Sequence, residues 1–414
     1  MGVKQLHEKD VVGTQVVDFE ERVDVRRLRR ERVGRIQGEL ARAGLGGLLL
    51  FDPINVRYAT GTRGFETFLL HLKGRHALIP REGKPVLFMP SVTEAPVLGE
   101  DIVGRPALNM DSWRTGSHTL EATKRWAAEM GDLLSELDIV GEPLGIDKTD
   151  IVTIHALEEQ GVDLEDGLMP MNLSRAVKTE DELVLIRQAC AIGDVALAKV
   201  QEAIEPGISE NELYAVLAGT NLRFGGERTD SKLLCAGGNT NPWLKREASG
   251  RLVLPGNLVT IDTDIAGPLG YFADISRTYM CGDSKPNEEQ DDAYKRAYQF
   301  LQECIPLYRA GASFQEISEK SPQMPEEYRA NRYTILAHGD GMSDEYPAIF
   351  FPDGSDTGFG NYPGELEKNM IISVESSWGR ENGLEQVKLE EQIIITRDGP
   401  EVISQAPFDW RFVG

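Results

Sequence analysis

The sequence predicts a two-domain α+β protein, in which a smaller α/β domain precedes a larger domain with helices outside a curved, mostly antiparallel sheet. The chain has 414 residues, more than one typical domain. Strand and helix patterns alternate through the first part, whereas the later strands carry acidic side chains. The Gly- and Pro-containing stretch 166–171 separates the two parts. We therefore expect domains at 1–170 and 171–414.

The N-terminal domain is predicted from hydrophobic periodicity. Residues 1–24 are polar and mixed, which is typical of an extended arm. Residues 25–43 place hydrophobic side chains at helical spacing beside an Arg-rich face. In so acidic a chain, that face indicates a solvated or interface helix rather than a nucleic-acid site. Further strands are expected at 45–51, 75–80 and 85–89, and further helices at 119–137 and 150–160.

The helices of the second domain are predicted from their caps. A long helix should occupy 179–203, because Thr179 can cap an acidic first turn. Ser209 and Glu212 form a capping-box pattern at the start of the next helix. Two more helices are expected at 287–309 and 313–320.

Three carboxylates lie in the stretch 258–279, which predicts a β-hairpin with turn residues between two apolar runs. They are Asp262, Asp264 and Asp274. Burying such a cluster is costly unless a cation neutralises it, so the stretch indicates a divalent metal site. The alternative is a hairpin whose acidic side chains face solvent.

The metal hypothesis gains support from three residues inside later apolar strands: His338, Glu375 and Glu390. Each Glu alone could be an edge or ion-paired residue. Together with the aspartates, they form an oxygen-rich set with one imidazole, which suits Fe(II), Mn(II), Co(II) or Zn(II). Two-metal sites of this kind hold their ions about 3.5–4 Å apart.

Composition narrows the partners and the compartment. The formal net charge is −23, which argues against nucleic acid and anionic membranes. The four cysteines show no CxxC spacing and suggest reduced thiols in a cytoplasmic protein. We find no signal-peptide pattern and no apolar run of about 18 residues, so secretion and membrane spanning are not expected.

These residues resemble the creatinase, prolidase and methionine aminopeptidase superfamily, which has the pita-bread fold. Its metal ligands occur in the order Asp, Asp, His, Glu, Glu. The matching residues here are Asp262, Asp274, His338, Glu375 and Glu390. The resemblance covers the whole chain, and NVRYATG at 55–61 resembles the start of the second strand in creatinase-like N-terminal domains. Further matches are LSRAVKTEDELVLIRQA at 173–189, PGISENEL at 206–213 and PGNLVTID at 255–262.

The departures from the peptidase pattern bear on the reaction. Trp243 stands where peptidase members have a histidine that helps to bind the substrate carbonyl, and Asp344 replaces a second histidine. Asp264 is inserted between the first two ligands. A peptidase without both histidines loses its means of polarising a scissile carbonyl, so ordinary proline-peptide hydrolysis is not expected.

The same departures resemble one branch of the superfamily, the dimethylsulfoniopropionate (DMSP) lyases of the DddP type. This resemblance implies β-elimination to dimethyl sulfide and acrylate, with Asp264 as a sixth ligand, two divalent ions, iron first among them, and a homodimer. It implies Asp344 as the catalytic base and Tyr333 as a pocket residue. Trp243 could face the sulfonium or be a core residue. The alternative for Tyr333 is a packing role in its strand, and the alternative for Asp344 is a turn-forming residue without a catalytic role. We expect Asp340 to shape the turn after His338.

Two other functions stay open at this stage. One is a metal-dependent hydrolase of a small amidine or dipeptide, for which Glu345 is the nearby candidate to polarise the substrate. The other is a non-enzymatic peptide-binding module of the same fold. Such modules typically lose ligands, whereas every ligand position is filled here.

Overall fold

The computed structural model describes residues 23–63, 70, 72–89, 100–243, 246–353 and 360–413. The chain forms two compact units, Asp24–Arg175 and a second unit that begins at Ala176. The expected boundary at 170 lies inside helix α8 (Leu168–Ala176), and the division between units falls at the end of that helix. All but the last two residues of the expected arm lie outside the described residues.

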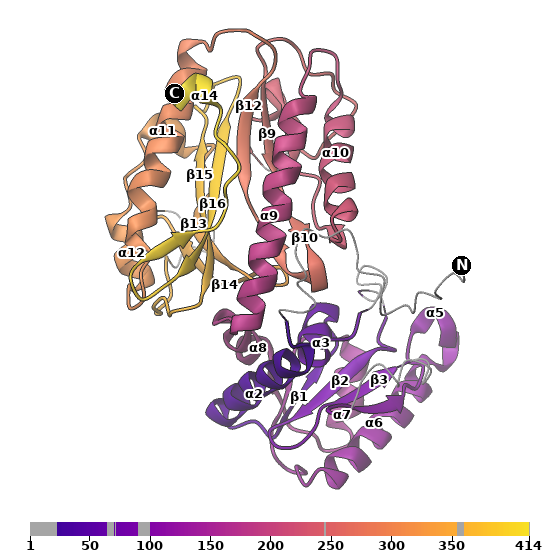
Figure 1. The fold of residues 1–414 in the computed structure, drawn as a ribbon. Helices are drawn as coiled ribbons and strands as arrows, with labels where there is room; N and C mark the ends of the chain where they lie inside the picture. The colour runs from indigo at the N-terminus through magenta and orange to yellow at the C-terminus, as the bar shows by residue number, and fades with distance from the viewer. Residues whose placement is uncertain are drawn as a thin grey trace, which may run out of the picture. The chain divides into compact units, whose positions relative to one another are not determined.

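The N-terminal unit is built on a six-stranded sheet with the order β4-β3-β2-β1-β5-β6. Strands β1, β2 and β3 of this sheet are labelled in Figure 1. Strand β1 pairs antiparallel with β2 and parallel with β5, so the sheet is mixed. Its strands are β1 (Gly47–Leu50), β2 (His76–Pro80), β3 (Val86–Met89), β4 (Val103–Pro106), β5 (Leu144–Ile146) and β6 (Leu164–Asp166). Its helices are α2 (Val25–Ala43), α3 (Pro53–Thr60), α5 (Ser112–Thr115), α6 (Thr119–Glu136), α7 (Ile151–Glu158) and α8.

One prediction in this unit is wrong. Residues 55–61 belong to helix α3 and its C-cap, not to the start of a strand. The Asp52 side chain accepts hydrogen bonds from the backbone N–H groups of Ile54 and Asn55, and Pro53 occupies the first turn. Gly61 ends the helix with φ +68°. These are the usual start and stop signals of a helix, and they outweigh the strand-like composition of the segment.

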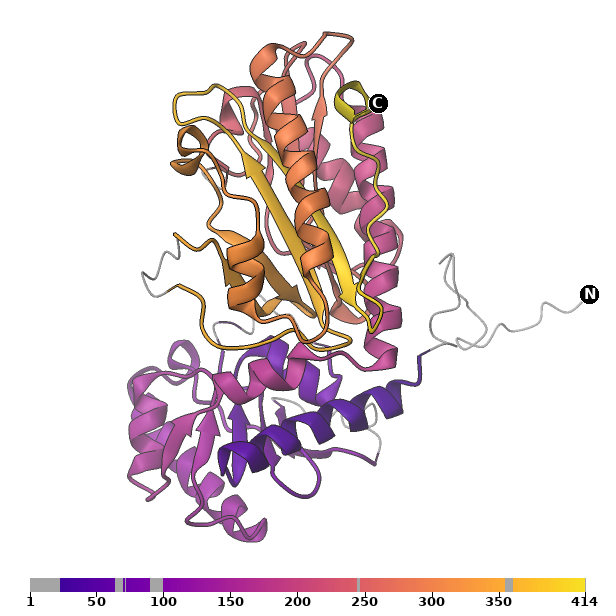
Figure 2. The same cartoon turned by 90° about the vertical axis from the view of Figure 1, so that its left-hand side faces the viewer.

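The helices of the second unit follow the predicted caps. Thr179 and Ser209 each form a complete capping box, at the starts of α9 (Glu180–Ala203) and α10 (Glu210–Arg223). Helix α11 (Glu288–Cys304) packs on β15 and β16, as Figure 2 shows, and α9 packs on the smaller strands around β11. The remaining helices are α12 (Phe314–Lys320), α13 (Glu326–Arg329) and α14 (Trp410–Val413).

Three sheets carry the strands of this unit, with the orders β11-β10-β7, β12-β9-β8 and β14-β13-β15-β16-β17. The predicted hairpin is present as β9 paired antiparallel with β12, and the short pair β10–β11 is inserted between them. The strands are β7 (Arg228–Thr229), β8 (Leu234–Ala236), β9 (Leu258–Asp262), β10 (Ile265–Ala266), β11 (Phe272–Ala273), β12 (Ser276–Met280), β13 (Ile335–Asp340), β14 (Asp344–Phe350), β15 (Ile371–Trp378), β16 (Val387–Ile395) and β17 (Pro400–Val402).

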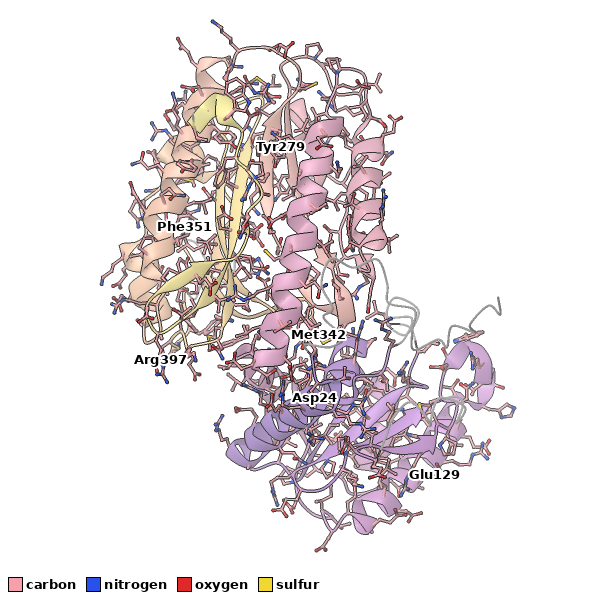
Figure 3. All side chains as sticks on the ribbon, viewed as in Figure 1. Asp24, Glu129, Tyr279, Met342, Phe351 and Arg397 are labelled. Carbon is pink, nitrogen blue, oxygen red and sulfur yellow. The ribbon has the colours of Figure 1, made fainter. Side chains whose placement is uncertain are left out.

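The core of this unit lies between α11, α12 and the five-stranded sheet. Phe351, which directly follows β14, belongs to this core. Met342, in the turn between β13 and β14, is also buried, and both residues are labelled in Figure 3. The four cysteines are buried and unpaired. Among the described helices, none is both long and apolar enough to cross a bilayer.

Candidate metal centre

Strand pairing brings the sequence-predicted ligands together. Glu375 on β15 lies directly opposite Glu390 on β16. His338 on β13 pairs with Ser373 of β15. Ser373 stands two residues before Glu375, so the side chains of His338 and Glu375 point to the same face of the sheet. Asp262 ends β9, and Asp274 lies just before β12, which pairs with β9. Five separate segments, β9, the residues before β12, β13, β15 and β16, therefore converge.

The converging side chains form three overlapping groups, within each of which one ligand atom per residue lies within 4.8 Å of the others. One group holds Asp262, Asp274 and Glu390, and a second holds His338, Glu375 and Glu390. All five residues are buried. The third group joins Asp274 and His338 to Asp340 and Asp344.

The donor set fits a divalent metal. Among the described residues, Asp262 Oδ1, Asp274 Oδ1 and Glu390 Oε1 are buried without a hydrogen-bond partner. Buried, unsatisfied carboxylate oxygens are costly, and a metal ion is the usual partner that removes this cost. One imidazole among carboxylates suits first-row metals such as Fe, Mn, Co and Zn.

Burial and neighbouring charges shift the pKa values of several groups in the centre. Burial first, and then the neighbouring carboxylates, raise the pKa values of Asp274 and Glu390 well above the usual range. Burial would also raise the pKa of Asp262, but Lys388 and nearby hydrogen bonds lower it. Burial opposes protonation of His338, yet Asp340 and the other carboxylates raise its pKa. A cation would relieve this repulsion.

Asp264 lies beside the centre and is not part of the three groups. It has φ +38°, an unusual value for a non-glycine residue, and its carboxylate accepts a hydrogen bond from the Ser231 hydroxyl. Burial and the charge of Asp262 raise the pKa of Asp264 to about 8.

Asp344 lies at the solvent-exposed side of the centre, at the start of β14. Its carboxylate is within 4.8 Å of the ligand atoms of His338 and Asp274. Partial desolvation raises the pKa of Asp344 to about 6, although the charge of His338 opposes the rise. An accessible carboxylate with a raised pKa has the properties of a general base.

The sequence analysis did not identify Lys388, whose ammonium lies among the carboxylates of the centre. Its side chain is 1% exposed, and its ammonium is 2.5 Å from Glu375 Oε2 and 3.2 Å from both Asp262 Oδ2 and Glu390 Oε2. It also donates to Ser276 Oγ at 2.8 Å. A period-two signal could have found it: Lys388 stands two residues before Glu390 on one strand, so both point to the same face.

The expectation for Asp340 needs correction. It does not shape the turn but ends strand β13 with its side chain fully buried. Its Oδ1 lies 3.3 Å from His338 Nδ1, and its Oδ2 accepts hydrogen bonds from Ser373 and Gln392. The same period-two rule accounts for this, because Asp340 follows His338 by two residues.

Two aromatic residues border the centre. The rings of Trp243 and Tyr333 have their centroids 5.9 Å and 5.8 Å from the Lys388 ammonium. Trp243 is 7% exposed and donates its backbone N–H to Gln386, whereas Tyr333 is half-buried. Burial raises the pKa of the Tyr333 hydroxyl, so it stays protonated and able to donate.

The chain matches two known protein families. Residues 184–397 match the model of metallopeptidase family M24, and residues 32–166 match the creatinase/prolidase N-terminal domain. The chain belongs to metallopeptidase family M24. Its fold is therefore the two-domain creatinase/prolidase fold, as predicted, and the chain is an enzyme with a metal-binding site.

Within the M24 family, the chain is similar to two proteins named dimethylsulfoniopropionate lyase DddP. It is 31% identical to the one from Roseovarius nubinhibens, over 94% of this chain and 89% of that protein. It is 30% identical to the one from Roseobacter denitrificans, over 94% and 88%. The resemblance to this branch is confirmed. An Xaa-Pro dipeptidase from Bacillus anthracis has the same fold, with a TM-score of 0.73 at 21% identity, over 92% of this chain and 99% of that one.

Proposed function

We propose that this protein is a metal-dependent lyase that cleaves DMSP by β-elimination to dimethyl sulfide and acrylate. Similarity to two DMSP lyases over nearly the whole chain supports the substrate class. The observation that carries the reaction type is the position of Asp344. It is an exposed carboxylate beside the buried ligands, within reach of a substrate held at the centre.

The proposed reaction needs a base more than a nucleophile. Asp344 would take the proton from the carbon next to the substrate carboxylate. The electron pair of that C–H bond becomes the new C=C bond, and the C–S bond breaks so that neutral dimethyl sulfide leaves. The proton stays on Asp344 until solvent accepts it. No water attacks, so the absence of the peptidase histidines does not impair this chemistry.

The proposed cofactor is a pair of divalent ions, iron first and Zn, Mn or Co as alternatives. When bound, such ions act as Lewis acids that hold the substrate carboxylate and stabilise the negative charge developing there. The proposal rests on the donor set and on the unsatisfied carboxylate oxygens. The proposed ligands are Asp262, Asp264, Asp274, His338, Glu375 and Glu390.

Trp243 and Tyr333 are the proposed substrate contacts. A tryptophan face attracts a sulfonium through a cation–π interaction worth about 0.5–2 kcal/mol. Both rings already lie near a cation, the Lys388 ammonium. We propose that Tyr333 donates a hydrogen bond to the substrate or orients Asp344.

The hydrolase alternative relies on Glu345 to polarise the substrate. However, Glu345 accepts hydrogen bonds from the Lys178 ammonium and from the backbone N–H of Met342, and its side chain is 4% exposed. A carboxylate held in a buried ion pair is poorly placed to reach substrate. This contact favours the lyase, although the M24 fold is shared with peptidases.

We also propose a homodimer, on the basis of the family resemblance, and a cytoplasmic location. Four buried, unpaired cysteines are in keeping with a reducing compartment. Light scattering after size exclusion tests the first proposal, because a single 45.9 kDa species would contradict it.

The experiment that tests the function is headspace gas chromatography of purified, metal-loaded protein incubated with DMSP. Wild type should release dimethyl sulfide, and Asp344→Ala should not, while keeping its bound metal. Asp398→Ala, at an exposed turn between β16 and β17, is the matched control and should match wild type. No dimethyl sulfide from wild type, combined with hydrolysis of dipeptides, would replace the proposal with the hydrolase.

A further inference from the structure

The two ring nitrogens of His338 face different groups. Nε2 points to the metal centre, 3.5 Å from Asp274 Oδ2 and 3.4 Å from Glu375 Oε1. Nδ1 points the other way, 3.3 Å from both Asp340 Oδ1 and the backbone oxygen of Gly339. Only Nε2 therefore faces the other ligands, and it must carry a lone pair to bind a metal.

Asp340 is itself fixed by two neighbouring strands. Its Oδ2 accepts a hydrogen bond from Ser373 on β15 at 2.5 Å and from Gln392 on β16 at 3.0 Å. Ser373 and Gln392 are directly paired across the two strands, and Ser373 also pairs with His338. The carboxylate has no exposed surface, so its orientation is set by the sheet.

The second oxygen of Asp340 has no hydrogen-bond partner in the described part of the chain, and His338 Nδ1 is the group it faces. A buried carboxylate oxygen in this position needs a donor. The imidazole can supply one only in the tautomer that carries its proton on Nδ1, which leaves the Nε2 lone pair directed at the centre.

We propose that Asp340 is a positioning residue for the metal centre: it holds His338 in the Nδ1–H tautomer and aims Nε2 at the metal. Ser373 and Gln392 fix Asp340 in turn. Carboxylates that hold a ligating histidine in this way also raise its basicity. The inference rests on the metal centre of the proposed function, but it does not depend on which substrate is cleaved.

Two competing roles for Asp340 predict different results. As a direct ligand, it would contribute to the number of ions bound. As the catalytic base, it would need to reach substrate, which its complete burial and its two donors oppose. The number of ions bound at saturation, measured together with the affinity, therefore distinguishes positioning from ligation, whereas turnover would fall in either case.

The test measures Co(II) binding by competition with a chelator, in the full-length protein. Asp340→Asn and Asp340→Ala should weaken Co(II) binding about 10–100-fold, while the number of ions bound at saturation stays that of wild type. Ser373→Ala keeps the carboxylate but removes one of its donors, and should weaken binding about threefold. Asp398→Asn is the exposed control and should bind like wild type.

Three outcomes would overturn the proposal: unchanged affinity in both Asp340 variants, a lower saturation stoichiometry, or no Co(II) binding by wild type. If neither Asp340 variant folds, an unchanged affinity in Ser373→Ala overturns it. A spectroscopic readout adds specificity, because NMR of ¹⁵N-labelled histidine in the Zn(II) form should show a slowly exchanging Nδ1 proton that Asp340→Ala loses. A Co(II)-binding wild type that leaves DMSP intact would refute the function and leave this inference standing.

Discussion

Replacing Lys388 by Met should destabilise the metal-free protein severely. The change keeps most of the side-chain volume but removes the ammonium that contacts Glu375, Asp262 and Glu390 at 2.5–3.2 Å. The side chain is 1% exposed, so water cannot replace the lost cation. Removing one partner of a buried ion pair costs about 3–5 kcal/mol, because the other charge is left buried and uncompensated.

Protonation limits this cost in a pH-dependent way. The carboxylates left behind can take up protons, and Glu390 already has a strongly raised pKa. The full loss of about 3–5 kcal/mol should therefore be seen near pH 8, and a smaller loss near pH 5.5. Adding Co(II) should recover part of the loss, since the ion neutralises the charge of the same carboxylates.

The assay is urea unfolding of chelator-treated protein at the two pH values. The transition to analyse is the one whose midpoint moves when Co(II) is added, because it reports the unit that holds the centre. Lys285→Met is the matched control, because Lys285 is exposed, and it should change the free energy of unfolding by less than about 0.5 kcal/mol. If Lys388→Met is as stable as wild type at pH 8 without metal, the ammonium does not compensate the carboxylates and our account of the centre is wrong.

Four further predictions concern the centre. Turnover requires Asp344 deprotonated. Its pKa is about 6 without metal, and a bound cation would lower it, so kcat/KM should rise with pH through an inflection at or below about 6. A profile that stays flat down to about pH 4 would count against Asp344 as the base. The pKa of Asp264 is about 8 in the folded protein and about 4 in the unfolded chain, so between these pH values the folded, metal-free protein binds more protons than the unfolded chain. Its stability should therefore fall as pH rises through this range, which thermal melts at pH 6 and 8 would check. His338→Ala should deplete bound metal in elemental analysis, and full retention would exclude it as a ligand. Trp243→Leu should raise KM about two- to thirtyfold with little change in kcat, and an unchanged KM would identify Trp243 as packing alone.

Local signals in the chain were sufficient for much of the second unit. The capping boxes at Thr179 and Ser209 started α9 and α10 where predicted, because a cap is satisfied within four residues of sequence. The strands carrying His338, Glu375 and Glu390 were also recognised, since each polar residue interrupts an apolar run. The local sequence also carried the helix start at Asp52-Pro53, which contradicts the strand expected at 55–61. The expectation that Asp340 shapes a turn was wrong as well, because strand β13 continues to Asp340.

The residue types that the centre can use, and the strands that carry them, follow from the order of amino acids along the chain. Which of these residues meet depends on how the strands pair in the folded protein. A period-two pattern places Asp340 on the strand face of His338 and Lys388 on that of Glu390. They contact the other groups of the site because β13, β15 and β16 pair in one register and turn the same faces inward. Register depends on contacts between residues far apart in the chain, so no local pattern specifies it.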